Sequence, residues 1–289
     1  MPEPRSTGLS GLDAQHDFIR ARRRATIAKL MARLRGEPDD VAVVLPYEEV
    51  IEALGLASEN SLGLRVVPLE QIVGSVGRGR DFDRRFRPTS GRSRGRWEQI
   101  AAAARRGEAF PPVDLVKVGH LYFVRDGHHR VSVARALGRS DIDAYVTEVK
   151  TRVDADKALK LSDLPVKSHE RVFFERVPLP IPARTEIQLA DPDEYDELAE
   201  AVEAWGFRVM QSQGEPLDRK HTAELWLETE YRPVVAMLRD AGLVESCTAT
   251  EAYMDIAAER YRLLRTHEWN EDVLRQVLEG RSRRRRLRG

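Results

Sequence analysis

The chain has 289 residues, 42% of them hydrophobic and 33% charged, and its basic and acidic side chains balance to a formal net charge of zero. This composition is typical of a protein that buries a core and argues against a uniformly basic nucleic-acid binder. A single cysteine, Cys247, excludes internal disulfides and cysteine-based metal clusters, and no apolar run reaches the length of a membrane span, so we expect a cytoplasmic protein.

The first 60 residues are predicted to form a helical extension. The pattern from Asp17 to Leu34 predicts a basic amphipathic helix. Its apolar stripe is formed by Phe18, Ile19, Ile27, Leu30, Met31 and Leu34. Such a helix can contact DNA, RNA or anionic lipid, and the alternative is a solvated helix packed on its own domain. A short strand over 41–45 and a short helix over 46–54 follow.

The stretch from Gly74 to Pro88 contains too many glycines for a regular element. Between residues 78 and 96 the sequence has eight arginines against two aspartates. A Gly-Ser-Gly loop beside arginines suits a phosphate or base contact, and an aspartate there can hold a metal or orient a hydroxyl. The candidate residues are Ser75, Arg78, Arg80 and Asp81. The alternative is a flexible surface loop whose charges are solvated.

A helix over 97–106 and two strands, over 113–118 and 121–124, lead to the sequence D-G-H-H-R. The second strand ends before this sequence, and a helix is predicted from His128 to Leu137, with Gly138 after its end. The five residues Asp126, Gly127, His128, His129 and Arg130 therefore lie where a strand meets a helix N-terminus. Backbone N–H groups and the positive end of a helix dipole favour a phosphate there. The alternative is a turn with solvated histidines and Asp126 as N-cap.

Four features follow one another between Arg65 and Val149. They are V-P-L-x-x-I at 67–72, P-P-V at 111–113, the G-x-x-R box at 127–130 and a closing strand at 142–149. In order and spacing they resemble the ParB/sulfiredoxin-like superfamily. The resemblance implies an α+β fold, with a nucleotide-binding domain at 61–150 between the N-terminal basic helix and a C-terminal, mostly helical domain.

In ParB partition proteins the box is G-E-R-R, and in sulfiredoxin a nucleophilic cysteine precedes His-Arg. His128 takes the place of that cysteine, so sulfiredoxin chemistry is excluded. The resemblance implies that Gly127, His129 and Arg130 hold the phosphates of a nucleoside triphosphate or diphosphate, CTP or ATP/ADP, with Mg²⁺. His128 replaces the ParB carboxylate that is linked to hydrolysis, and an imidazole can still position water. The histidine spacings fit no zinc site, so we expect no protein-held metal.

The leading prediction is a bacterial ParB-like, nucleotide-binding and DNA-associated protein that acts as a chromosome-partitioning-like or regulatory switch. The D-G-H-H-R sequence also resembles the free-serine kinases of the superfamily. A small-molecule kinase is therefore an alternative, in which Asp126 or Asp81 activates a substrate hydroxyl. A nucleotide-sensing adaptor without catalysis is a third. Whether the protein is an enzyme stays open.

Residues 151–190 are predicted as a linker. Its first part is charged and helical and ends at Pro165, and its second part is strand-like from Glu170 and becomes proline-rich by Pro182. ParB partition proteins usually carry a helix-turn-helix directly after the box domain, and the sequence shows none here. A centromere-binding role is therefore not implied.

Residues 191–280 are predicted as a mostly helical domain. An acidic first turn after Asp191 begins one helix, and Pro233 predicts a kink or restart near Arg232 in another. Thr248 or Thr250 can cap the helix that follows. A helical accessory or dimerisation domain is the favoured interpretation, and a helix-turn-helix around Gly242 is the alternative.

Residues 281–289 are predicted to be a disordered tail with six arginines in eight residues. Together with segments 20–35 and 78–96, this tail gives three arginine-rich stretches that can contact DNA without sequence preference. The expected partners are a nucleotide and DNA, and the sequence leaves a homodimer open.

Overall fold

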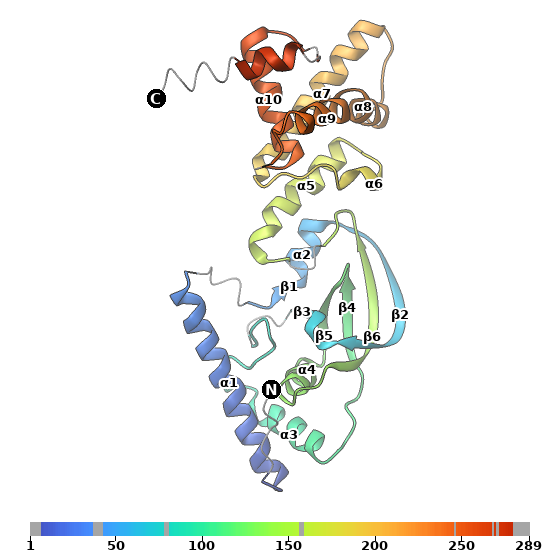
Figure 1. The fold of residues 1–289 in the computed structure, drawn as a ribbon. Helices are drawn as coiled ribbons and strands as arrows, with labels where there is room; N and C mark the ends of the chain where they lie inside the picture. The colour runs from blue at the N-terminus through green and yellow to red at the C-terminus, as the bar shows by residue number, and fades with distance from the viewer. Residues whose placement is uncertain are drawn as a thin grey trace. The chain divides into compact units, whose positions relative to one another are not determined.

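A computed structural model of the chain describes residues 7–36, 43–77, 81–155, 159–245, 247–267, 269 and 272–279. The chain divides into two compact units, the first ending at Lys167 and the second beginning at Ser168. All the named strands belong to the first unit, and the named elements of the second unit are helices (Figure 1). The prediction of a fold that mixes helices with a β-sheet is confirmed.

The first unit is built on a six-stranded mixed sheet with the order β1-β3-β5-β4-β6-β2. The strands are β1 (Leu45–Pro46), β2 (Leu56–Pro68), β3 (Ile72–Ser75), β4 (Val113–Val118), β5 (Leu121–Asp126) and β6 (Asp141–Thr151). β1, β3 and β5 run parallel to one another, whereas β4 is antiparallel to β5 and β2 is antiparallel to β6. The carboxyl ends of β1, β3 and β5 therefore meet at one edge of the sheet.

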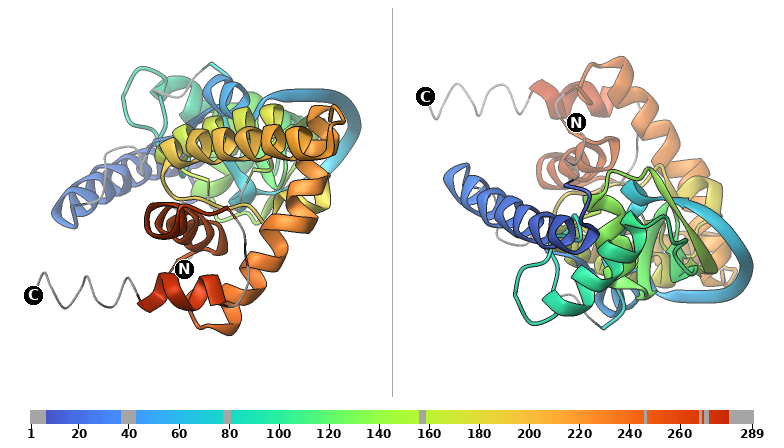
Figure 2. Two further views of the ribbon diagram at one scale, coloured as in Figure 1. Left: turned by 90° about the horizontal axis from the view of Figure 1, so that it is seen from above. Right: turned by 90° about the horizontal axis from the view of Figure 1, so that it is seen from below.

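The burial of side chains along the strands shows where the core lies. In β4, Val113, Leu115, Val116 and Val118 are all fully buried, as expected for a central strand covered on both faces. At the far edge, β2 is much more exposed along its length and curves strongly (Figure 1 and Figure 2). The strands predicted at 113–118 and from Leu121 are confirmed, the second extending two residues further than expected.

Four helices accompany the sheet: α1 (Ser10–Leu34), α2 (Tyr47–Leu54), α3 (Arg94–Arg105) and α4 (His128–Ala136). α1 and α3 lie side by side (Figure 1), with the rings of Phe18 and Trp97 5.5 Å apart and an ion pair of 2.7 Å between Arg105 and Asp17. α4 follows β5 directly, and Gly138 has a φ of 78°, so the predicted end of this helix is confirmed.

α1 packs on its own domain, as one of the two interpretations from the sequence expected, but it does not pack through the apolar stripe. Phe18 is buried, but the other members of the predicted stripe are exposed: Ile19, Ile27, Leu30, Met31 and Leu34. The buried face consists mostly of alanines, among them Ala14 and Ala21, which allow α1 to approach α3 closely. The sequence pattern identified the stripe by its large hydrophobic side chains. The face that packs on α3 instead carries small side chains, which allow the two helices to approach each other closely.

The named helices of the second unit are α5 (Leu164–Arg176), α6 (Ile181–Arg184), α7 (Pro192–Gln213), α8 (Arg219–Trp226), α9 (Arg232–Asp240) and α10 (Ala249–Leu264). A π-helical turn, Leu227–Tyr231, joins α8 to α9, and residues 272–279 are also helical. The restart predicted at Arg232 is confirmed. Thr248 caps α10 by accepting from the Glu251 N–H, with the Glu251 carboxylate accepting in return.

The predictions for the segment before α7 are wrong. Residues 170–176 lie in α5 rather than in a strand, and Pro165 stands in the first turn of that helix instead of ending one. Proline is tolerated in a first turn because its missing N–H would have no intrahelical acceptor there. Phe173 and Phe174 are buried on α5, and the Phe173 ring also contacts Tyr195 of α7, so burial of these side chains on a helix outweighed the β-propensity of the sequence.

Candidate functional site

The candidate site lies at the edge where β1, β3 and β5 end. Ser75 is the last residue of β3, and Asp126 is the last residue of β5. α2 begins directly after β1, and α4 begins two residues after β5 ends. Crevices outside the carboxyl ends of neighbouring parallel strands are the usual ligand sites of open sheets. The topology thus brings Ser75 and the D-G-H-H-R sequence to the same edge.

Gly127 makes the turn from β5 into α4. Its φ is 98°, which L-residues rarely adopt, and an added Cβ would lie 2.5 Å from Val113 Cγ1. Gly127 is also the residue before the first helical position, so the alternative interpretation, in which Asp126 is the N-cap, is wrong. The first intrahelical bond runs from Val131 N–H to Gly127 O at 3.0 Å. The N–H groups of the first helical turn therefore point toward this edge of the sheet.

His128 joins the helix to the neighbouring strand. Its Nε2 lies 2.7 Å from Ser75 Oγ, a buried hydrogen bond between residues 53 apart in sequence. The ring of His128 stacks on the ring of Phe82, with their centroids 6.2 Å apart, and lies tilted beside the ring of Phe86, with centroids 6.3 Å apart. Phe82 also meets the ring of His129 edge-on at 5.4 Å. Phe82 and Phe86 thus cover the imidazole, and only 5% of the surface of His128 is exposed.

Arg130 points away from Ser75, toward the entry of β4. Its guanidinium donates to Pro111 O at 2.9 Å and to Pro112 O at 2.6 Å. It also forms a 2.6 Å ion pair with Asp126, whose side chain is 74% exposed. Arg130 and Asp126 are therefore engaged with each other, and Arg130 ties the D-G-H-H-R turn to the Pro-Pro segment.

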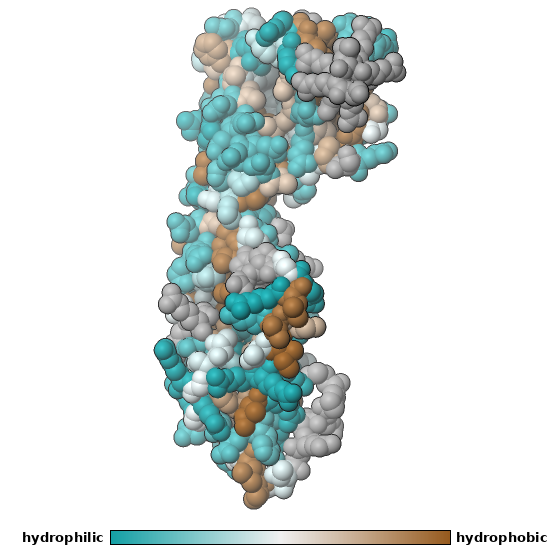
Figure 3. All heavy atoms as spheres, turned by 90° about the vertical axis from the view of Figure 1, so that its left-hand side faces the viewer, coloured by the Kyte–Doolittle hydropathy of each residue, from teal (hydrophilic) through white to brown (hydrophobic). Residues whose placement is uncertain are grey.

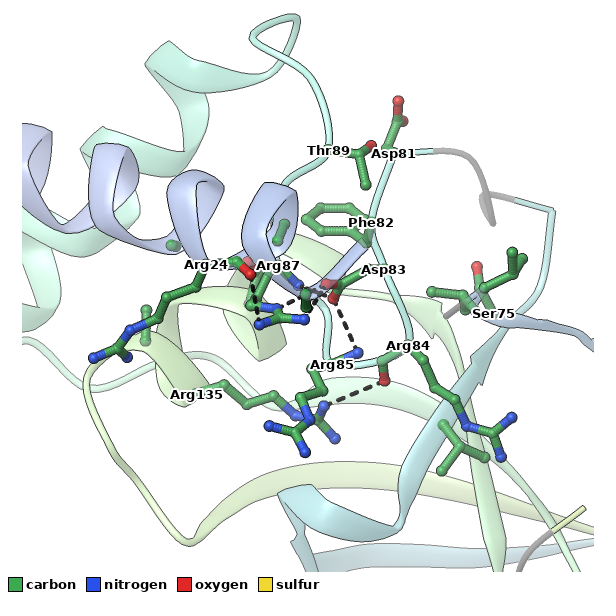
Figure 4. Close-up of a pocket in the computed structure, with 18 of the residues that line it drawn as sticks. Arg24, Ser75, Asp81, Phe82, Asp83, Arg84, Arg85, Arg87, Thr89 and Arg135 are labelled. Carbon is green, nitrogen blue, oxygen red and sulfur yellow. Dashed lines mark hydrogen bonds and ion pairs between the residues drawn. The ribbon is translucent and has the colours of Figure 1, made fainter. Parts of the chain in front are cut away.

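The loop after β3 is organised by Asp83. Its carboxylate accepts from the backbone N–H groups of Arg85 and Arg87, at 3.0 and 2.9 Å, and pairs with the Arg87 guanidinium at 2.7 Å. Arg87 in turn donates to Arg24 O on α1. Asp81 lies beside Thr89 with its carboxylate directed away from these groups (Figure 4). The predicted residues Arg78 and Arg80 lie outside the described residues.

Arg135 is a site residue that the sequence analysis missed. Its guanidinium donates to Ile72 O at 2.7 Å and to Leu69 O, and it lies 5.5 Å from the ring of Phe86. Burial lowers the pKa of Arg135 to about 10. The sequence could have indicated Arg135 as a site residue, because it follows His128 by seven residues and so lies on the same face of α4. Arg135 fastens α4 to the segment that leads into β3.

A cavity of about 2560 Å³ opens beside this edge (Figure 4). Ser75, Gly77 and Asp81 line it, whereas Gly127, His129 and Arg130 are not among its lining residues. Basic side chains outnumber acidic ones in the lining, ten to seven. The basic set is Arg20, Arg24, Lys29, Arg33, Arg35, Arg84, Arg85, Arg87, Arg135 and Arg139. The cavity is thus suited to an anionic ligand.

Metal binding was predicted only through a nucleotide. Among the described residues, no three histidine, cysteine, aspartate or glutamate side chains are grouped so that they could hold a metal ion. Any divalent cation at this edge would therefore need ligands from a bound phosphate in addition to the protein.

Comparison with known proteins gives little further guidance. No protein-family model matches the sequence, and no curated protein matches it. A solved ParB-N domain, described as Pnob8-like, shares 14% sequence identity over 72% of this chain and 83% of its own. The TM-score of that superposition is 0.21, so the likeness carries no argument about fold or function.

Proposed function

We propose that this protein is a ParB-like nucleotide-binding protein whose ligand phosphates bind where β3 and β5 end. The observation that carries the proposal is the hydrogen bond between Ser75 and His128. It joins the lining of a predominantly basic cavity to the first residue of α4. A helix N-terminus and a basic cavity both favour an anion, and here they are adjacent.

The proposed phosphate contacts are the Ser75 hydroxyl, the Gly77 backbone and the Arg85 guanidinium. All three residues line the cavity. Arg85 is exposed, whereas Arg84 donates to Leu159 O and Arg87 pairs with Asp83. Arg85 can therefore turn toward a ligand without losing a described side-chain bond, and its planar guanidinium suits two phosphate oxygens.

The D-G-H-H-R sequence has a different role for each residue in this proposal. Gly127 forms the turn, His129 contributes its backbone N–H to the positive end of the α4 dipole, and Arg130 positions the turn through Pro111 and Pro112. His128 orients the Ser75 hydroxyl, and Asp81 is the candidate ligand for Mg²⁺ that arrives with the nucleotide. CTP and ATP/ADP are the ligands proposed.

The test is thermal unfolding with CTP, ATP and ADP, each with Mg²⁺. A nucleotide at a hundred times its Kd should stabilise the protein by about 2.7 kcal/mol. Arg85→Ala should abolish this stabilisation, whereas Arg92→Ala should keep it. Arg92 is the matched control because it is exposed on the same loop and does not line the cavity. Absence of stabilisation by all three nucleotides, or equal stabilisation of Arg85→Ala, would refute the proposal.

DNA association is the second part of the proposal, and the exposed residues Arg92 and Arg96 support it. Phosphate contacts make DNA affinity fall with salt, by roughly 0.9 in log–log slope per contact. The Arg92→Ala, Arg96→Ala double variant should reduce that slope by about two and leave nucleotide binding intact. Unchanged salt dependence in this variant would exclude these two arginines as DNA contacts.

A further inference from the structure

The solvent face of α1 carries a long apolar stripe. Each of its large apolar residues is 47–73% exposed: Leu9 at the helix start, then Leu12, Ile19, Ile27, Leu30, Met31 and Leu34. Figure 3, which faces the side of the molecule where α1 lies, shows brown apolar groups at intervals along it among hydrophilic ones. One exposed leucine needs no explanation, but a series of exposed apolar residues aligned on one helix is typical of an interaction surface.

The apolar residues are aligned because their spacing follows the helix. Leu12, Ile19, Ile27 and Leu34 are seven or eight residues apart and so fall on one face. The buried residues Ala14, Phe18, Ala21 and Ala25 lie roughly opposite, at 100° per residue. α1 therefore has two contact faces, of which one packs on α3 and the other has no contact partner among the described residues.

Basic residues flank this stripe. From Phe18 to Arg35 the helix and its C-cap contain seven basic residues and no acidic one. By helical geometry Arg24 and Arg33 project about 90° to either side of the stripe, and Arg23 lies within it. Both acidic residues of the helix, Asp13 and Asp17, are on the buried face. The exposed side of α1 thus combines aliphatic side chains with basic ones, of which Arg24 and Arg33 also line the cavity described above.

We propose that this face of α1 binds the surface of an anionic lipid bilayer. Aliphatic residues would enter the boundary between headgroups and acyl chains, while the flanking arginines meet lipid phosphates. Arginine side chains suit this position because their long stems lie along apolar surface and their charges reach water. No helix in the described part of the chain is long and apolar enough to cross a membrane, so attachment occurs at the surface.

The chemistry of the exposed face of α1 argues against two other binding partners, a second copy of the chain and DNA. A second copy of the chain would bring the basic residues in and beside the stripe, among them Arg23, Arg24 and Arg33, against an identical set, and like charges repel across such an interface. DNA would accept the arginines but would leave the aliphatic residues without apolar contacts. An anionic bilayer can contact the aliphatic residues with its acyl chains and the arginines with its phosphates.

The test is flotation of the full-length protein with vesicles. We expect binding to vesicles of phosphatidylcholine with about one third phosphatidylglycerol, and none to pure phosphatidylcholine, because the basic residues are attracted only to the anionic lipid. The Ile27→Ser, Leu34→Ser double variant keeps every charge and should bind about tenfold more weakly, because it removes two aliphatic contacts. Neither residue lines the cavity proposed for nucleotide, so nucleotide binding should be unchanged.

The matched control is Leu64→Ser, Val66→Ser on β2, which removes two comparably exposed apolar residues outside α1. It should bind vesicles like the wild type. All exchanged residues are about half exposed or more, so the variants should fold, as circular dichroism can verify. Failure to bind anionic vesicles, or equal binding by the Ile27→Ser, Leu34→Ser variant, would refute the proposal. A dimer that this variant converts to a monomer would identify a second copy as the occupant instead.

Discussion

Replacement of Gly127 by alanine tests whether the turn into α4 requires glycine. A φ of 98° costs an L-residue about 1–2 kcal/mol. The new Cβ would also lie 2.5 and 2.9 Å from Val113 Cγ1 and Cβ, which real Cβ atoms do not tolerate. Overpacking of this kind adds about 1–3 kcal/mol. The free energy of unfolding should therefore fall by about 3 kcal/mol, which lowers Tm by roughly 6–12 °C for a unit of this size.

Gly138→Ala separates the two causes. Gly138 also has a positive φ, 78°, but an added Cβ there would meet nothing within 4 Å. This variant should lose only the conformational part, about 1–2 kcal/mol. Both glycines lie in the first unit, so both substitutions should shift the unfolding transition of that unit in urea titrations followed by circular dichroism. If Gly127→Ala were no less stable than Gly138→Ala, the steric reasoning about Val113 would be wrong.

Three further substitutions probe buried or paired groups. Arg135→Met should lower the free energy of unfolding by about 2–3 kcal/mol in urea titrations, because it removes the hydrogen bonds that the charged guanidinium donates to the Leu69 and Ile72 carbonyls. Ser132→Ala should cost about 1–2 kcal/mol in the same assay, because the Trp97 indole N–H, now 2.8 Å from the hydroxyl, would lose its acceptor. The two hydrogen bonds from Arg232 lower the pKa of Glu186 below 4.5, so its contribution to stability is present above pH 4.5 and is lost as pH falls through the lowered value. Glu186→Gln should therefore reduce the difference between urea midpoints at pH 6.5 and pH 3, and an unchanged difference would contradict this assignment.

Local signals in the sequence predicted the elements around the site well. The strand at 113–118 and the start of α4 at His128 follow from short apolar runs and from Gly127, whose effects act within a few residues. The restart at Arg232 follows from Pro233 in the same way. In each case the deciding chemistry lies next to the element it determines.

The details of the site depend on contacts between distant residues and could not be predicted. The Arg130 side chain bonds to carbonyls 18 and 19 residues away, and Arg135 bonds to carbonyls more than 60 residues away. No periodic pattern in the sequence encodes such partners. The buried face of α1 could not be predicted for the same reason, since it depends on which face fits α3 rather than on which face is more apolar.

The strand order has a consequence for synthesis of the chain. β6 lies between β4 and β2 and is the ladder partner of both, yet it is the last strand to be translated. β2 ends at Pro68 and β6 begins at Asp141, an interval that takes roughly 4–15 s at 5–20 residues per second. During that interval the 13-residue β2 has no β6 to pair with on a ribosome. Its two register shifts and its charged residues Glu59 and Arg65 would then discourage pairing with other chains until the sheet can close.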